Sequence, residues 1–110
     1  MELVYHPSKL LETRCDEIDI ENINFNPTEL KDEMIDFMRS KNGIGMSANQ
    51  IGITDKRLFV MTDRHGGQSI MCMNPTVAQH TTEHIVVEEG CMSFPNVWMK
   101  VKRPREILVH

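Results

Sequence analysis

The sequence predicts an α+β fold, in which one amino-terminal helix packs on mostly antiparallel β-sheets. The first observation behind this class is an amphipathic stretch at residues 27–40, whose apolar side chains recur with helical spacing. The second is a series of short stretches rich in Val, Ile, Thr and Met between residues 57 and 109, which Gly, Pro and Asn separate. The third is the length, because 110 residues suit one domain, and we assign residues 1–110 to a single domain.

Composition excludes several classes of protein. Hydrophobic residues make up 40% of the chain and charged residues 25%, as in an ordinary soluble globular protein. The net charge is -4 with both signs interspersed, so no basic stripe indicates nucleic acid binding. No apolar run approaches the roughly 18 residues of a membrane span, and the first residues lack a secretory signal. Since three irregularly spaced cysteines fit a reducing compartment, we expect a cytoplasmic protein that binds neither nucleic acid nor membrane.

The helix at residues 27–40 has clear start and stop signals. Asn26 can cap it, Pro27 suits the first helical position, and Glu29 lies three residues after the cap. Asn42 and Gly43 offer a left-handed exit after the last turn. The predicted apolar face consists of Leu30, Met34, Phe37 and Met38.

The rest of the chain is predicted to be irregular or extended. We expect residues 1–25 to be irregular and residues 43–50 to form a glycine-containing loop after the helix. A hairpin is expected, with strands at residues 57–61 and 70–73 and a turn at residues 64–67. Further extended stretches are expected at residues 76–81, 83–88, 97–101 and 106–109, with a break at Arg103 and Pro104.

Two segments carry residues suited to hydrolytic chemistry. Residues 86–95 read Val-Val-Glu-Glu-Gly-Cys-Met-Ser-Phe-Pro, which we interpret as an apolar strand that runs into a Glu-Glu-Gly-Cys turn. Cys91 in this turn can become a metal ligand, because a divalent metal deprotonates a thiol. Residues 43–50 read Gly-Ile-Gly-Met-Ser-Ala-Asn-Gln, and the side-chain amide of Gln50 is a neutral hydrogen-bond donor.

These segments resemble the first and second motifs of the peptide deformylases, Gly-x-Gly-x-(Ala/Ser)-Ala-x-Gln and Glu-Gly-Cys-(Leu/Met)-Ser-x-Pro. The resemblance implies a peptide-deformylase-like fold and a metallohydrolase that removes the formyl group from formyl-methionyl nascent peptides, releasing formate. It implies Cys91 as a ligand of a divalent metal, iron(II) first and zinc or nickel next. It also implies a role in protein biosynthesis through amino-terminal methionine processing, with the ribosome as a partner.

The resemblance further assigns catalytic donors. The side chain of Gln50 and the backbone N–H of Met92 would donate hydrogen bonds to the oxyanion of a tetrahedral intermediate. We therefore expect the sulfur of Cys91 and the carboxamide of Gln50 to meet around one metal-bound water.

Substrate binding is implied for the same two segments. A peptide can pair its main chain with an exposed extended segment, and glycines let it approach closely. Ile44 and Val87 would line an apolar pocket for a methionine side chain. The full predicted substrate-binding set is Gly43, Ile44, Gly45, Val87, Glu89 and Gly90.

The third motif of the family, His-Glu-x-x-His, does not occur in this sequence, which ends at His110. In the family this motif lies on a helix and supplies two metal ligands and the general base. We interpret the sequence as truncated at its carboxyl end, with the metal-binding helix missing, and we expect residues 1–110 alone to be inactive.

Two alternatives remain open at this point. The chain can be a non-catalytic remnant that keeps the peptide-binding strand without the metal. It can also hold structural zinc through Cys91 and a histidine, because His80 to His84 spell His-Thr-Thr-Glu-His, an inverted zinc motif. That motif needs a helix, however, and in the predicted strand its histidines would lie about 13 Å apart.

Overall fold

The computed structural model describes residues 1–63 and 67–110. It contains one α-helix, three 3₁₀ helices and antiparallel strand pairs within these residues, so the predicted α+β class is confirmed. The elements follow in the order η1 (Lys9–Glu12), η2 (Ile20–Asn22), α1 (Pro27–Ser40), β1 (Gly45–Ser47), η3 (Ala48–Ile51), β2 (Leu58–Thr62), β3 (Ser69–Met73), β4 (Val77–His80), β5 (His84–Cys91), β6 (Phe94–Pro104) and β7 (Ile107–Val109).

Helix α1 begins and ends where its sequence signals predict. The side chain of Asn26 accepts a hydrogen bond from the Glu29 N–H at 3.1 Å, which satisfies one unpaired donor of the first turn. At the other end Asn42 adopts the left-handed conformation with φ of 59°. The Gly43 N–H then donates to the Met38 carbonyl at 2.9 Å, which closes the last turn.

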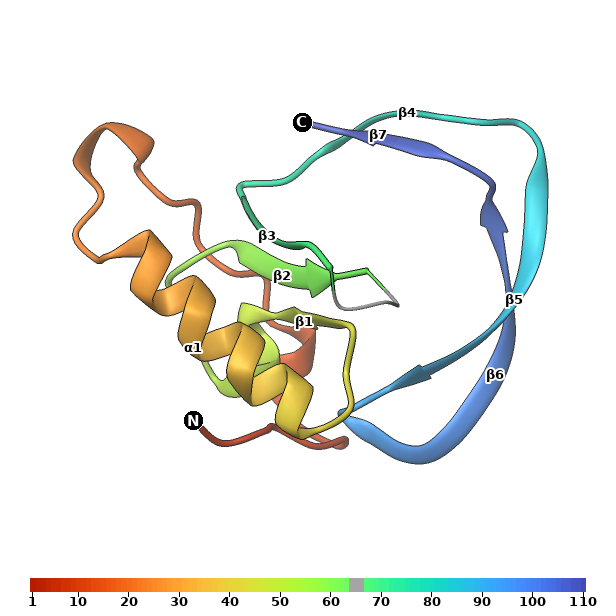
Figure 1. The fold of residues 1–110 in the computed structure, drawn as a ribbon, viewed down its shortest axis with the longest axis horizontal. Coiled ribbons are helices and arrows are strands. Elements are labelled where there is room, and N and C mark those ends of the chain that lie inside the picture. The colour runs from red at the N-terminus through yellow and green to blue at the C-terminus, as the bar shows by residue number, and fades with distance from the viewer. Residues whose placement is uncertain (64–66) are drawn as a thin grey trace.

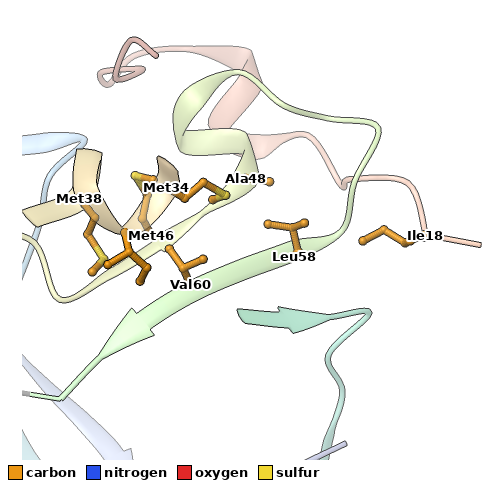
Figure 2. Packing of buried hydrophobic residues seen from close by; sticks show 8 residues of the cluster. Ile18, Met34, Met38, Met46, Ala48, Leu58 and Val60 are labelled. Atoms are coloured by element: carbon orange, nitrogen blue, oxygen red, sulfur yellow. The ribbon is translucent and has the colours of Figure 1, made fainter. Parts of the chain in front are cut away.

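The core lies between α1 and a sheet with the strand order β1-β2-β3 (Figure 1). Met46 of β1 stands opposite Val60 of β2, and both point towards Met34 and Met38 of α1 (Figure 2). These four side chains are at most 2% exposed. Methionine is unbranched and flexible, so it fills the irregular space between a helix and a short strand. The predicted apolar face omitted Ile35, which is also buried.

The second half of the chain forms a long, curved hairpin of β5 and β6 (Figure 1). The pair β4 and β7 connects the far end of this hairpin to the end of β3. The hairpin turn is formed by Met92 and Ser93, and it lies near the segment that leaves α1. The β5–β6 hairpin therefore returns Cys91 to the compact half of the molecule.

Several predicted boundaries were wrong. The stretch 43–50 is not all loop, because its backbone pairs with β2 in β1 and then turns into η3. The Glu-Glu-Gly-Cys turn is strand, since β5 continues to Cys91 and the chain turns one residue later. The strand predicted at 97–101 is β6, which starts at Phe94 and includes the expected break at Arg103 and Pro104.

Other expectations held or fall outside the described structure. The hairpin of residues 57–61 and 70–73 is confirmed as β2 and β3, with ends that differ by one residue. The region 1–25 contains the short helices η1 and η2, which were not predicted. The turn predicted at residues 64–67 lies outside the described residues, apart from Gly67.

The buried methionines should dominate stability. Met38→Ala removes a side chain that is 0% exposed, and we expect it to lower the free energy of unfolding by about 2–5 kcal/mol. The matched control is Met99→Ala on β6, where the side chain is 61% exposed and the expected loss is small. Urea unfolding measures both losses, and equal losses would contradict the assignment of the core.

Candidate active site

Gln50 and Cys91 lie next to each other, as expected from the two sequence segments. Gln50 Nε2 donates to Cys91 Sγ at 3.4 Å and to Ser93 Oγ at 3.1 Å. The two residues come from different elements, because Gln50 belongs to η3 and Cys91 ends β5. The tight turn of Met92 and Ser93 brings Ser93 back to the same amide. One carboxamide thus joins the segment after α1 to the β5–β6 hairpin.

The side-chain oxygen of Gln50 also has hydrogen-bond partners. Gln50 Oε1 accepts a hydrogen bond from the Ser47 N–H at 3.0 Å and lies 3.2 Å from Ser47 Oγ. Because a backbone N–H can only donate, the atom facing it must be the amide oxygen, and Nε2 must face Cys91. The pattern Ser47-x-x-Gln50 is a capping box at the start of η3. This pattern is visible in the sequence, although we predicted a loop for the segment.

Cys91 has the exposure and position of a metal ligand. Its thiol is free and the residue is exposed, at the end of a paired strand. A register shift between Gly90 and Cys91 marks a bulge, which re-aims side chains at the end of a strand. Residues 1–63 and 67–110 contain no group of three or more His, Cys, Asp or Glu that could hold a metal ion. The role of Cys91 as a metal ligand therefore stays a prediction, and the described residues do not complete a metal site.

Met92 anchors the turn through its side chain. The thioether of Met92 is partly buried against the core and lies directly over Gly43. A Cβ at Gly43 would come within 2.9 Å of Met92 Cε and 3.1 Å of Met38 Cγ, so a side chain there would displace the end of Met92 and crowd Met38. This gives Gly43 an internal role that the sequence did not suggest. The backbone N–H of Met92 as an oxyanion donor stays a prediction.

Gly45 differs from Gly43 because the space beside it is open. A Cβ at Gly45 would meet only the Val60 carbonyl, at an ordinary 3.9 Å. Gly45 begins β1, which is the edge strand of its described sheet. Ile44 precedes it and is 54% exposed. An extended edge with an open glycine and an exposed aliphatic side chain can accept a further strand.

The remaining predicted site residues belong to the β5–β6 hairpin. Glu89 forms a double hydrogen bond with Arg103, with 2.7 Å between Arg103 Nη2 and Glu89 Oε1. The hydrogen bond from Arg103 lowers the pKa of Glu89 below its ordinary value. Gly90 lies under the ring of Trp98, its partner in the register. Val87 is half-buried on the same face as Glu89.

The amino-terminal segment binds both halves of the site, which the sequence did not predict. The Val4 N–H donates to the Gln50 carbonyl at 2.7 Å, and the His6 N–H donates to the Ser93 carbonyl at 2.9 Å. Asn49 Nδ2 donates to the carbonyls of Leu10, Leu11 and Thr13 at 3.2–3.4 Å. These are backbone partners, which leave no side-chain signal in a sequence.

The structure does not show the predicted methionine pocket, and it places the histidines of the inverted zinc motif in strands. A groove of about 350 Å³ lies between the amino-terminal segment and Phe94, whose ring stacks on His6 at 4.7 Å, and neither Ile44 nor Val87 lines it. The methionine pocket of these two residues therefore stays a prediction. His80 and His84 lie in strands, as the sequence predicted, and each Nδ1 contacts a backbone carbonyl.

Known proteins share both the sequence and the fold of this chain. The family model for polypeptide deformylase matches residues 1–110. The chain belongs to the polypeptide deformylase family. It is 37% identical to peptide deformylase 1B of Solanum lycopersicum, described as chloroplastic, over 99% of this chain and 39% of the relative. It is 30% identical to the peptide deformylase of Borreliella burgdorferi, over 100% of this chain and 65% of the relative.

The solved structures of deformylases have the same architecture. Peptide deformylase 1B of Arabidopsis thaliana matches with a TM-score of 0.86 and 31% identity, over 99% of this chain and 60% of that chain. This chain therefore spans between 39% and 65% of the length of the deformylases compared here. In residues 1–63 and 67–110, no helix is long and apolar enough to cross a membrane.

The two glycines of this deformylase motif should respond differently to a methyl group. Gly43→Ala must displace the Met92 side chain, and we expect a loss of about 1 kcal/mol or more in unfolding free energy. Gly45→Ala meets no close contact and should stay within about 0.5 kcal/mol of the wild type. Urea unfolding of both variants is the measurement. A larger loss for Gly45→Ala than for Gly43→Ala would contradict the packing described here.

Proposed function

We propose that the complete gene product is a peptide deformylase, which hydrolyses the formyl group of formyl-methionyl nascent peptides and releases formate. The observation that carries this proposal is the contact of 3.4 Å between Gln50 Nε2 and Cys91 Sγ. A side-chain amide beside a candidate metal ligand is suited to stabilise an oxyanion that forms at the metal. Membership in the deformylase family supports the same reaction.

The side chain of Gln50 would act as an oxyanion donor. Its Oε1 is held by the Ser47 N–H, so Nε2 is already directed towards Cys91 before substrate arrives. A donor that needs no reorientation stabilises developing charge more effectively than water does. The backbone N–H of Met92 is proposed as a second donor, since it follows Cys91 in the hairpin turn.

Cys91 would be one ligand of a divalent metal. The family is one of metal-dependent deformylases, and for this member we propose iron(II), with zinc or nickel as substitutes. When bound, such a metal supplies an activated water and polarises the formyl carbonyl. We propose that a His-Glu-x-x-His motif elsewhere in the complete gene product supplies the other ligands and the general base. Residues 1–110 contribute one of the three protein ligands usual for a catalytic site, so we expect them to be inactive alone.

The peptide substrate would bind along the edge of β1. Main-chain hydrogen bonds from Gly45 would hold it as an added strand beside the Ile44 side chain, because the Ile44 carbonyl already accepts the Thr62 N–H at 2.9 Å. The formyl end would be directed at Gln50 and Cys91. The open space at Gly45 lets the peptide approach closely. We further propose that the β5–β6 hairpin, through Val87, Glu89 and Gly90, borders the bound peptide. A nascent chain leaving the ribosome in the cytoplasm would be the natural source of this substrate.

Substitutions of Cys91 and Gln50 are expected to have different effects on metal content and on catalysis. With a formyl-methionyl tripeptide, Cys91→Ala should abolish both metal content and formate release in the complete gene product. Gln50→Ala should keep the metal and lower kcat by about 10²–10³-fold, because one oxyanion donor is lost. Formate release that survives Cys91→Ala would contradict the proposal. If metal is lost with His80→Ala or His84→Ala instead, the structural zinc alternative would be correct.

Gly45 provides a separate test of substrate binding. Because Gly45→Ala is expected to leave stability unchanged, any effect on catalysis reports on the approaching peptide. We expect KM to rise about tenfold, with the metal content unchanged, because the added methyl group keeps the substrate main chain away from β1. Phe59→Leu on β2, which lies in the same sheet, serves as the control for sheet packing. An unchanged KM would place the peptide elsewhere.

A further inference from the structure

Ser93 is a buried polar residue for which the resemblance assigned no role. It is 0% exposed, although it lies in the turn of a hairpin, where serine is usually exposed to solvent. Burying a hydroxyl without a hydrogen bond is unfavourable, so its partner is informative. That partner is the side chain of Gln50, with 3.1 Å between Nε2 and Ser93 Oγ.

Thr62 offers a useful comparison, because it is the other buried polar residue in the part of the chain that the structure describes. The Thr62 hydroxyl donates to the Gln68 carbonyl at 2.9 Å, which is a backbone partner within a hairpin. Such a bond satisfies the hydroxyl and serves the fold only. The Ser93 hydroxyl instead accepts from a side chain that also contacts Cys91.

We propose that Ser93 is a positioning residue for Gln50, which fixes the orientation of its amide for oxyanion stabilisation; this inference rests on the proposed function. A primary amide has two N–H groups, and here one is directed to Ser93 and the other to Cys91. With Oε1 held by the Ser47 N–H, the amide has hydrogen-bond partners at both Nε2 and Oε1. Loss of the Ser93 contact removes one of the hydrogen bonds that restrain its last torsion, which is a soft one.

Ser93 is itself held in place from the other side. Its carbonyl accepts the His6 N–H at 2.9 Å, while the Val4 N–H donates to the Gln50 carbonyl at 2.7 Å. The two partners, Ser93 and Gln50, are therefore tied to the same amino-terminal segment. Because both backbones are held, the fold keeps the hydroxyl within reach of the amide.

The kinetic test compares Ser93→Ala with Gln50→Ala and with the double variant, in the complete gene product. We expect Ser93→Ala to lower kcat by about 10- to 100-fold through misplacement of the donor. KM for a formyl-methionyl tripeptide and the metal content should stay within about twofold, since neither depends on the amide. In the Gln50→Ala background, Ser93→Ala should have no further effect, because Ser93 acts through Gln50. An equal loss in both backgrounds would overturn the proposal.

A second measurement does not depend on activity. The side-chain amide signals of Gln50 are identified by NMR as those that disappear in Gln50→Ala. We expect Ser93→Ala to shift them, and Ser40→Ala to leave them in place. Ser40 is a matched control, since its hydroxyl also makes one hydrogen bond, to the Phe37 carbonyl at 2.6 Å, on the exposed end of α1. Unshifted Gln50 signals in Ser93→Ala would overturn the positioning role.

The two proposals can fail separately. If the wild type releases no formate with iron(II), zinc or nickel, the proposed function fails, and the NMR comparison still decides whether Ser93 orients Gln50. If Ser93→Ala does not fold, Ser93→Cys replaces it, because a thiol keeps nearly the same volume and is only a weak acceptor. The same losses and shifts are then expected, and their absence contradicts the proposal.

Discussion

The carboxamide of Gln50 is the interaction on which the arrangement of the site depends. It connects η3, which follows the helix, with the end of β5, and these elements share no other side-chain hydrogen bond among the described residues. The capping box of η3 determines which atom of the amide faces the hairpin. A local rule of helix capping therefore sets the polarity of a contact between residues 41 positions apart.

The core explains why this contact can form. Met34 and Met38 of α1 and Met46 of β1 belong to one core cluster, and Met92 from the hairpin turn packs against it. Met38 and Met92 both lie beside Gly43. The position of Cys91 is thus fixed on one side by thioether packing and on the other by hydrogen bonds. The absence of a side chain at Gly43 is what allows the turn to approach this closely.

The sequence predicts the parts of this fold that local chemistry determines. Helix α1 was predicted with its bounds because Asn26, Pro27 and Asn42 act within one turn of its ends. Strand β1 was missed because three residues become a strand only by pairing with β2, which is a long-range effect. The length of β6 was underestimated because Arg103 and Pro104 suggested a break, whereas both residues pair with β5.

For the candidate site too, the sequence predicts only some of the features. Motif resemblance brought Gln50 and Cys91 together, and the geometry agrees, whereas the burial of Ser93 depends on tertiary packing. The partner of Glu89 was also beyond sequence reasoning. Arg103 stands opposite Ile85 in the register, so the ion pair spans four residues along the curved hairpin. Which cation meets which carboxylate across such a curve follows from the shape of the sheet.

The hydrogen bonds of Val4 and His6 have a consequence for biosynthesis. Their acceptors are the carbonyls of Gln50 and Ser93, so the segment around Val4 and His6 docks only after residues far along the chain have been made. Contacts of such sequence separation form late and slow the folding of a small domain. Until Ser93 has been translated, the His6 N–H therefore lacks its acceptor in the folded structure.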